Sequence, residues 1–176
     1  GEYTIFAGLE DCLKFIEDYK FTEEHLDFLR AQMPTAKDYK FTEEHLDFLR
    51  AQMPTAKEEF LEYLRQLDCS EVKIYAMKEG SVCFPRQPLL RVEGPVGICQ
   101  LLETTLLCLI NFASLVATNA ARMRAAVGPN KTLLEFGLRR SQGPDGGLSA
   151  SKYSYIGGFD GTSSALAGLK FGMKHR

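Results

Sequence analysis

The sequence has little excess charge, few histidines and no paired-cysteine motif, and each absence excludes a class of protein. Its 176 residues contain 21 Lys and Arg against 23 Asp and Glu, so the formal net charge is −2. No global positive field therefore favours nucleic acid or an acidic membrane as a partner. The five cysteines form no CxxC motif, and the three histidines do not lie at zinc-ligand spacing from them. We expect no metal site, and reduced, packed thiols in a cytosolic protein.

Long hydrophobic runs are also missing. The longest apolar stretch, residues 106–117, is interrupted by Asn111 and Ser114, and it falls short of the roughly 20 residues of a membrane span. No signal peptide is predicted at the start of the chain. The Walker A and GxGxxG fingerprints are absent, and no catalytic triad or carboxylate pair stands out. Hydrophobic residues make up 45% and charged residues 25%, which is typical of one soluble globular domain.

A twenty-residue block, DYKFTEEHLDFLRAQMPTAK, occurs at residues 18–37 and again at residues 38–57. Solenoid repeats drift in sequence and need at least about three copies, so two identical copies indicate a duplication or an assembly error rather than an architecture. Each copy predicts a helix with Thr22 or Thr42 as N-cap. The second copy fits the sequence that follows it, which makes the first the expected insertion. The block's histidines, His25 and His45, are predicted to lie on the surface.

Patterns around the block predict further helices and short strands. A short amphipathic helix is expected at residues 9–16, and a capping box at residues 55–58 leads into a helix that buries the apolar stripe of EFLEYLRQL. Short strands are expected in VKIYAM and in GSVCFPRQPLLRVEG. One long, mostly buried helix follows at residues 98–127, with Arg124 near its negative end.

The last part of the chain predicts an alternation of strand and helix. Residues 132–138 are expected to form a buried strand, continuous in apolar character except for Glu135. A helix with Ser149 as its N-cap should follow, then a strand near residues 159–162 and a helix in SALAGLKFG. This alternation indicates an α/β arrangement.

Arginines and glycines gather where the strand at residues 132–138 is expected to end. Ligands of α/β folds lie beyond the carboxyl ends of strands, and the planar guanidinium groups of Arg139 and Arg140 suit phosphate. The glycines Gly143, Gly146 and Gly147 would let the backbone approach an anion near a helix N-terminus. However, arginines after a strand and a GPDGG turn are also common on protein surfaces. Chemistry alone leaves both interpretations open.

Three further side chains near these strand ends are candidates for the same site. Phe136 could stack on a flat ligand or belong to the core. Ser163 and Ser164 follow the next predicted strand, and their hydroxyls could donate to a carboxylate if both strands belong to one barrel. A polar turn with a helix N-cap explains the two serines equally well.

Three long motifs resemble the nicotinate phosphoribosyltransferase family. They are LDCSEVKIYAM with the later PLLRVEGP, QLLETTLLCLINFASLVATNAARMR, and EFGLRRSQGPDGGLSASKYSYIGGFDGTSS. The resemblance covers nearly the whole chain outside one copy of the block and the last few residues. It implies a type II phosphoribosyltransferase of α/β class, with residues 1–131 as an N-terminal α+β domain and residues 132–176 as the start of a β/α barrel. We therefore expect this chain to be the N-terminal portion of a longer enzyme.

The resemblance also implies a reaction. The family joins nicotinate to 5-phosphoribosyl 1-pyrophosphate, coupled to hydrolysis of ATP with Mg²⁺, and forms nicotinate mononucleotide for NAD synthesis as a cytosolic homodimer. On this chain it implies Phe136 at the pyridine ring and Arg139 at the phosphoribosyl donor. Arg140, Gly146 and Gly147 stay candidates for a phosphate loop on the chemistry of the residues alone.

The resemblance implies that Ser164 lies where nicotinamide-using relatives carry an aspartate. A hydroxyl accepts a carboxylate ligand that an aspartate would repel, so the resemblance favours nicotinate. The family's phosphorylatable histidine segment is missing, and His175 lacks its neighbours, so no catalytic residue is assigned. We expect the 176-residue chain to be inactive alone; the alternative is a non-catalytic fragment that dimerises or binds other proteins.

Overall fold

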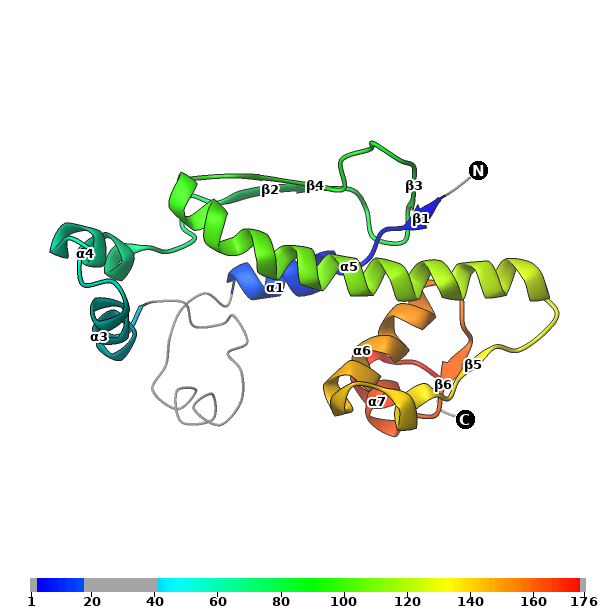
Figure 1. Ribbon diagram of the computed structural model, residues 1–176. Helices are drawn as coiled ribbons and strands as arrows, with labels where there is room; N and C mark the ends of the chain where they lie inside the picture. Colours follow the sequence, from blue (N-terminus) through cyan, green and yellow to red (C-terminus); the bar gives the residue numbers. More distant parts are fainter. Residues whose placement is uncertain (1–2, 18–40, 175–176) are drawn as a thin grey trace. The chain divides into compact units, whose positions relative to one another are not determined.

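The computed structural model describes residues 3–17 and 41–174 (Figure 1). They form two compact units, and each is described by itself. The first unit comprises residues 1–9, 75–91 and 106–176, and the second comprises residues 10–74 and 92–105. The first copy of the repeated block, with Thr22 and His25, lies outside the described residues, as does His175. The boundary expected between residues 131 and 132 stays a prediction.

Three helices belong largely to the second unit: α1 (Leu9–Glu17), α3 (Glu43–Gln52) and α4 (Glu58–Gln66). The second copy of the block forms α3, and its predicted N-cap is confirmed because the Thr42 hydroxyl accepts from the backbone N–H of His45. His45 is exposed as expected, but its ring also accepts from the backbone N–H of Thr42. Leu46 on α3 and Leu61 on α4 are fully buried, so both helices present an apolar face to the unit's interior.

The capping box predicted at Thr55–Glu58 is wrong. Helix α4 begins at Glu58, its N-cap is Lys57, and no side chain caps it. The Arg65 guanidinium instead ties α4 to α3 by an ion pair with Glu43 at 2.9 Å. Because both partners are largely exposed, this pair contributes little stability, and the buried leucines hold the two helices together.

The described strands are short and form three two-stranded sheets. Strand β1 (Thr4–Ile5) pairs antiparallel with β3 (Val82–Cys83), and β2 (Lys73–Ala76) pairs with β4 (Leu90–Glu93). Strands β2, β3 and β4 confirm the expectation for the VKIYAM and GSVCFPRQPLLRVEG segments, whereas β1 was not predicted. The mixture of helix and strand confirms the α/β class.

The predicted long helix is confirmed as α5 (Val96–Val127), which spans 32 residues. In the first unit two buried hydroxyls on α5 accept hydrogen bonds from the end of β1 and from the segment that follows it. Thr118 Oγ1 accepts from the backbone N–H of Ile5 at 2.9 Å, and Ser114 Oγ accepts from that of Ala7 at 3.2 Å. Backbone donors of an irregular segment need such partners when they are buried. Ser114, which interrupts the apolar stretch, and Thr118 just beyond it therefore fix the N-terminal segment on the helix.

By length and composition alone, α5 is also able to cross a membrane, with a mean hydropathy of 1.7 over its most apolar window. Only 39% of that window is buried in the structure, so the expectation of a mostly buried helix is wrong. Leu107 and Leu115 are both more than half exposed. Hydrophobic helices at the core of globular proteins have the same composition, and the hydrogen bonds from Ile5 and Ala7 show protein packing on one face of this helix.

All five cysteines are free. Cys12 and Cys83 are buried, and burial raises the pKa of the half-buried Cys69 thiol to about 11. These features suit unreactive, packed thiols. Cys108 is exposed on α5, so the prediction of a packed thiol is wrong at that position.

The C-terminal part of the first unit contains β5 (Leu134–Glu135), a 3₁₀ turn η2 (Gly137–Arg140), α6 (Gly143–Ile156), β6 (Gly161–Thr162) and α7 (Ala165–Phe171). The strand expected over residues 132–138 is therefore too long, and its expected burial is wrong because Phe136 and Leu138 are exposed. Its end is set by the Glu135 carboxylate, which accepts from the backbone N–H of Gly137 and turns the chain into η2.

Helix α6 begins six positions before the predicted N-cap, because the GPDGG segment is its first turn rather than a loop. Gly143 has a φ of +78°, which suits glycine at the sharp entry into the helix. Pro144 follows in the first turn, where a missing N–H costs no hydrogen bond. Ser149 thus lies inside the helix, and its predicted capping role is wrong.

Small residues let α6 approach α5 closely within the first unit (Figure 1). Ala113 and Ala117 of α5 are fully buried with Tyr153 of α6 in one apolar cluster. Gly157, which ends α6, lies against the α5 backbone. A Cβ added there would overlap the carbonyl oxygen of Ala117 and lie 2.6 Å from the Ala120 Cβ. The α5–α6 contact therefore requires glycine at this position.

Replacing Gly157 with alanine should destabilise the chain by about 1–3 kcal/mol, because a backbone oxygen cannot give way as a side chain can. Gly146→Ala is the matched control on the same helix, since an added Cβ there meets its nearest neighbour only at 4.0 Å. That change should stabilise α6 by roughly 0.5–1 kcal/mol through lower backbone entropy in the unfolded state. Urea unfolding measures both free energies; equal effects of the two changes would contradict the close contact.

Candidate functional site

The carboxyl ends of β5 and β6 bring the two predicted clusters of site residues together. The two strands pair in parallel with Glu135 opposite Thr162, and the backbone N–H of Ser163 donates to the Glu135 carbonyl at 2.9 Å. Phe136 and Ser163 therefore leave neighbouring strand ends side by side. This parallel pair is the arrangement on which the predicted site depends.

The residues predicted at the pyridine ring and the donor lie on accessible positions. Phe136 directly follows β5 and is 63% exposed. Arg139 and Arg140 are exposed on η2, which contacts α6. Both guanidinium groups are thus available to an anion, but so is any surface arginine, and their exposure does not decide between the two interpretations.

The two serines differ in their surroundings. Ser163 is half-buried, whereas Ser164 is 7% exposed and caps α7 by accepting from the backbone N–H of Ala167 at 3.2 Å. The N-cap interpretation is therefore confirmed for Ser164. A cap uses the hydroxyl oxygen as an acceptor and leaves its hydrogen free, so the capping role remains compatible with donation to a carboxylate.

The glycines predicted in a phosphate loop are the first turn of α6. Gly147 is buried where the helix packs on η2, and an added Cβ would overlap the Leu138 side chain and lie 3.1 Å from Ser141 Oγ. Because Gly147 has no side chain, η2, which carries Arg139 and Arg140, can pack closely against α6. Gly146 is half-buried with open space around it.

A hydrogen-bonded network beneath these residues was missed in the sequence. Ser151 Oγ of α6 donates to Glu135 Oε2 at 2.7 Å and lies 3.0 Å from Thr162 Oγ1. The backbone N–H of Ser164 donates to Thr162 Oγ1 at 3.0 Å. Ser151 and Thr162 are each 1% exposed. The one available signal was Glu135, a single charged residue in an otherwise apolar strand, because a charge at such a place needs buried partners.

A second polar cluster fixes the base of the strand pair. Arg124 of α5 forms an ion pair with Asp160 and donates to the carbonyl oxygens of Gly158, at 2.8 Å, and Lys131, at 2.7 Å. The Asp160 carboxylate also accepts from the backbone N–H of Leu133 at 2.7 Å. Arg124 therefore lies near the helix end as predicted, and it holds the chain entering β5 beside the chain entering β6.

Hydrogen bonding from the Leu133 backbone and from Arg124 lowers the pKa of Asp160 below its ordinary value of 3.8. A carboxylate whose folded pKa is lowered stabilises the fold above its unfolded pKa, and this contribution is lost as the pH falls through the folded pKa. Asp160→Asn should therefore be less stable than the wild-type chain at about pH 6, and the difference should narrow as the pH falls below 3.8.

Urea unfolding of both proteins between about pH 2 and pH 6 measures that difference. Asp145→Asn, which removes an exposed carboxylate of the same unit, controls for the loss of one charge. A difference between the wild type and Asp160→Asn that stays constant across this range would contradict the role given to the ionised form.

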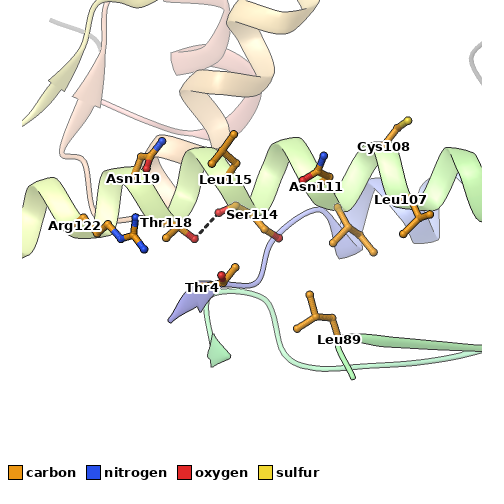
Figure 2. Close-up of a pocket in the computed structure, with 11 residues that line it drawn as sticks. Thr4, Leu89, Leu107, Cys108, Asn111, Ser114, Leu115, Thr118, Asn119 and Arg122 are labelled. Carbon is orange, nitrogen blue, oxygen red and sulfur yellow. Dashed lines mark hydrogen bonds between the residues drawn. The ribbon is translucent and has the colours of Figure 1, made fainter. Parts of the chain in front are cut away.

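A separate groove of about 640 Å³ runs along α5 in the first unit (Figure 2). Its walls include Leu89, Leu107, Leu115 and Arg122, and Thr4 of β1 closes one side. None of the predicted site residues lines it. Within residues 3–17 and 41–174, no group of three or more His, Cys, Asp or Glu side chains could hold a metal ion.

Comparison with known proteins covers both the N-terminal helices and the strand-end site. A family model described as the nicotinate phosphoribosyltransferase N-terminal domain matches residues 31–111. Nicotinate phosphoribosyltransferase of Dictyostelium discoideum is 56% identical over 176 residues, which is 100% of this chain. The human counterpart is 49% identical over 98% of it. A crystal structure of human nicotinic acid phosphoribosyltransferase superimposes with a TM-score of 0.76 at 47% identity, covering 100% of the chain.

The chain belongs to the nicotinate phosphoribosyltransferase family. Its similarity to the Dictyostelium protein extends to the last residues of the chain, further than the sequence motifs indicated. The strand-end site lies beyond the residues matched by the family model but inside these longer alignments.

The chain spans about a quarter to a third of the family members that it matches. It corresponds to 26% of the Dictyostelium protein, 29% of the human one and 31% of the human crystal structure. Residues 3–17 and 41–174 therefore cover only part of the length of these family members, and within them β5 and β6 form a parallel strand pair.

Proposed function

We propose that this chain supplies part of the nicotinate- and donor-binding site of a nicotinate phosphoribosyltransferase. The observation that carries the proposal is the parallel β5–β6 pair, which sets Phe136 beside Ser163 in a chain 47% identical to the human structure. The reaction would join nicotinate to 5-phosphoribosyl 1-pyrophosphate and yield nicotinate mononucleotide and pyrophosphate, coupled to ATP hydrolysis, on the route from nicotinate to NAD.

The side chains at the two strand ends suit these substrates. An exposed aromatic ring at Phe136 offers a face on which a pyridine can stack. The hydroxyls of Ser163 and Ser164 offer hydrogen-bond donors to the nicotinate carboxylate. Arg139, one turn away on η2, offers a guanidinium to the phosphoribosyl donor, and Arg140 with the Gly146–Gly147 turn of α6 offers further contacts to phosphate.

The pyridine nitrogen would attack the anomeric carbon as pyrophosphate leaves, so negative charge grows on the leaving group. Guanidinium groups positioned at that charge stabilise the transition state. Mg²⁺ would supply further charge neutralisation, but the residues that the structure describes form no metal cluster, so no step is assigned to it on this chain. A cytosolic homodimer is the state we propose for the complete enzyme.

Arg139→Ala tests the proposal in a chimaeric enzyme in which residues 1–176 replace the matching 26% of the Dictyostelium protein. Loss of one charge-assisted hydrogen bond should lower kcat/KM for the phosphoribosyl donor on the order of ten- to a hundredfold. Formation of nicotinate mononucleotide at varied donor concentration gives this value.

Two matched variants sharpen that measurement. Lys131→Ala removes an exposed cation from the loop before β5 and should change kcat/KM little. Arg139→Lys keeps the charge but loses the planar fork, so it should recover only part of the activity. An unchanged kcat/KM in Arg139→Ala would remove this residue from the site, and a wild-type chimaera without activity would contradict the proposed function.

A second candidate function is a non-catalytic fragment that pairs with another copy of itself. The exposed apolar side chains on α5, Leu107 at 59% and Leu115 at 58%, and the groove beside them favour it. The two candidates are compatible, since catalysis belongs to the complete enzyme and association to this portion.

The 176-residue chain alone should therefore show no nicotinate-dependent release of pyrophosphate. Its site residues Phe136 and Arg139 stay open to water, where electrostatic contacts to the donor are weak. The assay is run beside the chimaera described above, and sedimentation equilibrium gives the mass of the chain in solution. Turnover by the isolated chain would overturn this expectation.

A further inference from the structure

The Glu135 carboxylate joins the two turns that carry the proposed substrate contacts. Its Oε1 accepts from the backbone N–H of Gly137, the first residue of the turn that carries Arg139. Its Oε2 accepts from Ser151 Oγ at 2.7 Å. One side chain therefore connects the arginine-bearing turn to the interior of α6.

The hydroxyls extend this connection to the second turn. Thr162 Oγ1 accepts from the backbone N–H of Ser164 at 3.0 Å, and its own hydrogen has two acceptors in reach, Ser151 Oγ at 3.0 Å and Glu135 Oε2 at 3.3 Å. The Ser151 hydroxyl lies 3.1 Å from the carbonyl oxygen of Gly147, but the Glu135 carboxylate is its charged and closer acceptor. Hydrogen bonds thus connect Ser164 through Thr162 and Ser151 to Glu135.

We call this chain of hydrogen bonds, from Ser164 through Thr162 and Ser151 to Glu135, the relay. Its two central hydroxyls are buried, so each depends on its partners in the relay. Thr162 and Ser151 are each 1% exposed, so no bulk water is available to replace a lost partner. A buried donor left without an acceptor destabilises the conformation that contains it. Removing the Thr162 hydroxyl would leave the Ser164 N–H in that state, next to the hydroxyl that caps α7.

We propose that Glu135, Ser151 and Thr162 are positioning residues that hold the Ser163–Ser164 turn in place for nicotinate relative to the turn that carries Arg139. The inference rests on the proposed function and extends it to residues beneath the proposed substrate contacts, since Ser151 and Thr162 are buried. They set where the two serine hydroxyls point, and through them how well the site receives a carboxylate.

Thr162→Val is the decisive variant, because valine keeps the shape of threonine and removes only the hydroxyl. In the chimaeric enzyme it should raise the KM for nicotinate roughly tenfold, a factor that corresponds to about 1.4 kcal/mol, while kcat changes less than about twofold. Ser151→Ala should have a smaller effect, since Thr162 Oγ1 lies 3.3 Å from Glu135 Oε2 and can donate to it directly. Thr162→Ser restores the hydroxyl and should restore the KM.

The control is Ser154→Ala, which removes a buried hydroxyl from the same helix outside the relay. Hydrogen–deuterium exchange of the peptide covering residues 161–167 provides a readout independent of activity. Exchange in this peptide should rise in Thr162→Val and stay at the wild-type level in Ser154→Ala, because only the first variant frees the Ser164 N–H.

Each outcome decides the proposal. Equal exchange and equal KM in Thr162→Val and Ser154→Ala would overturn it, as would faster exchange with no change in the KM for nicotinate. If Thr162→Val does not fold, a KM and an exchange rate at the control level in Ser151→Ala would overturn it as well. A wild-type chimaera without activity would contradict the proposed function instead, and the exchange measurement would still show whether the relay holds the turn.

Discussion

The close approach of α6 to α5 is the contact on which the rest of the first unit depends. Alanines on α5 and Gly157 at the end of α6 bring the two backbones together, and no larger side chain fits there. Because α6 lies between β5 and β6 in the chain, its position on α5 sets where the two strands meet. The parallel strand pair and the turns at its end follow from a contact whose closeness depends on small residues.

Polar side chains then align β5 and β6, which the contact between α5 and α6 brings together. Arg124 and Asp160 hold the starts of β5 and β6, while Glu135, Ser151 and Thr162 hold their ends. Short two-residue strands form few ladder hydrogen bonds, so side chains supply the remaining connections. Position in this part of the molecule is set by satisfied buried polar groups, which specify one arrangement more strictly than apolar packing does.

Long, regular features were predictable from sequence because local patterns determine them. The helix α5, the helix of the second repeat copy with its Thr42 cap, and the strand–helix–strand order near the C-terminus all follow from periodicity and capping chemistry. The end of β5 was not predictable in the same way, since it depends on the Glu135 side chain folding back onto its own backbone. GPDGG was misassigned as a turn because proline and glycine also suit the first turn of a helix.

The site itself was predictable only in its exposed half. Phe136, Arg139 and Ser163 stand out because their side chains suit a ring, a phosphate and a carboxylate. The hydrogen-bonded residues beneath them, Ser151 and Thr162, do not stand out in the sequence, because only the fold places them beside Glu135.

In the proposed site, the exposed residues and the buried residues beneath them would affect substrate affinity in different ways. Exposed groups such as Phe136 and Arg139 gain strength only when substrate or further protein excludes water from them. The relay, in contrast, is formed when the chain folds, so binding a ligand need not order its hydroxyls again. In the proposed site, discrimination for a carboxylate would therefore depend more on the buried hydroxyls of Ser151 and Thr162 beneath the two serines than on the exposed arginines.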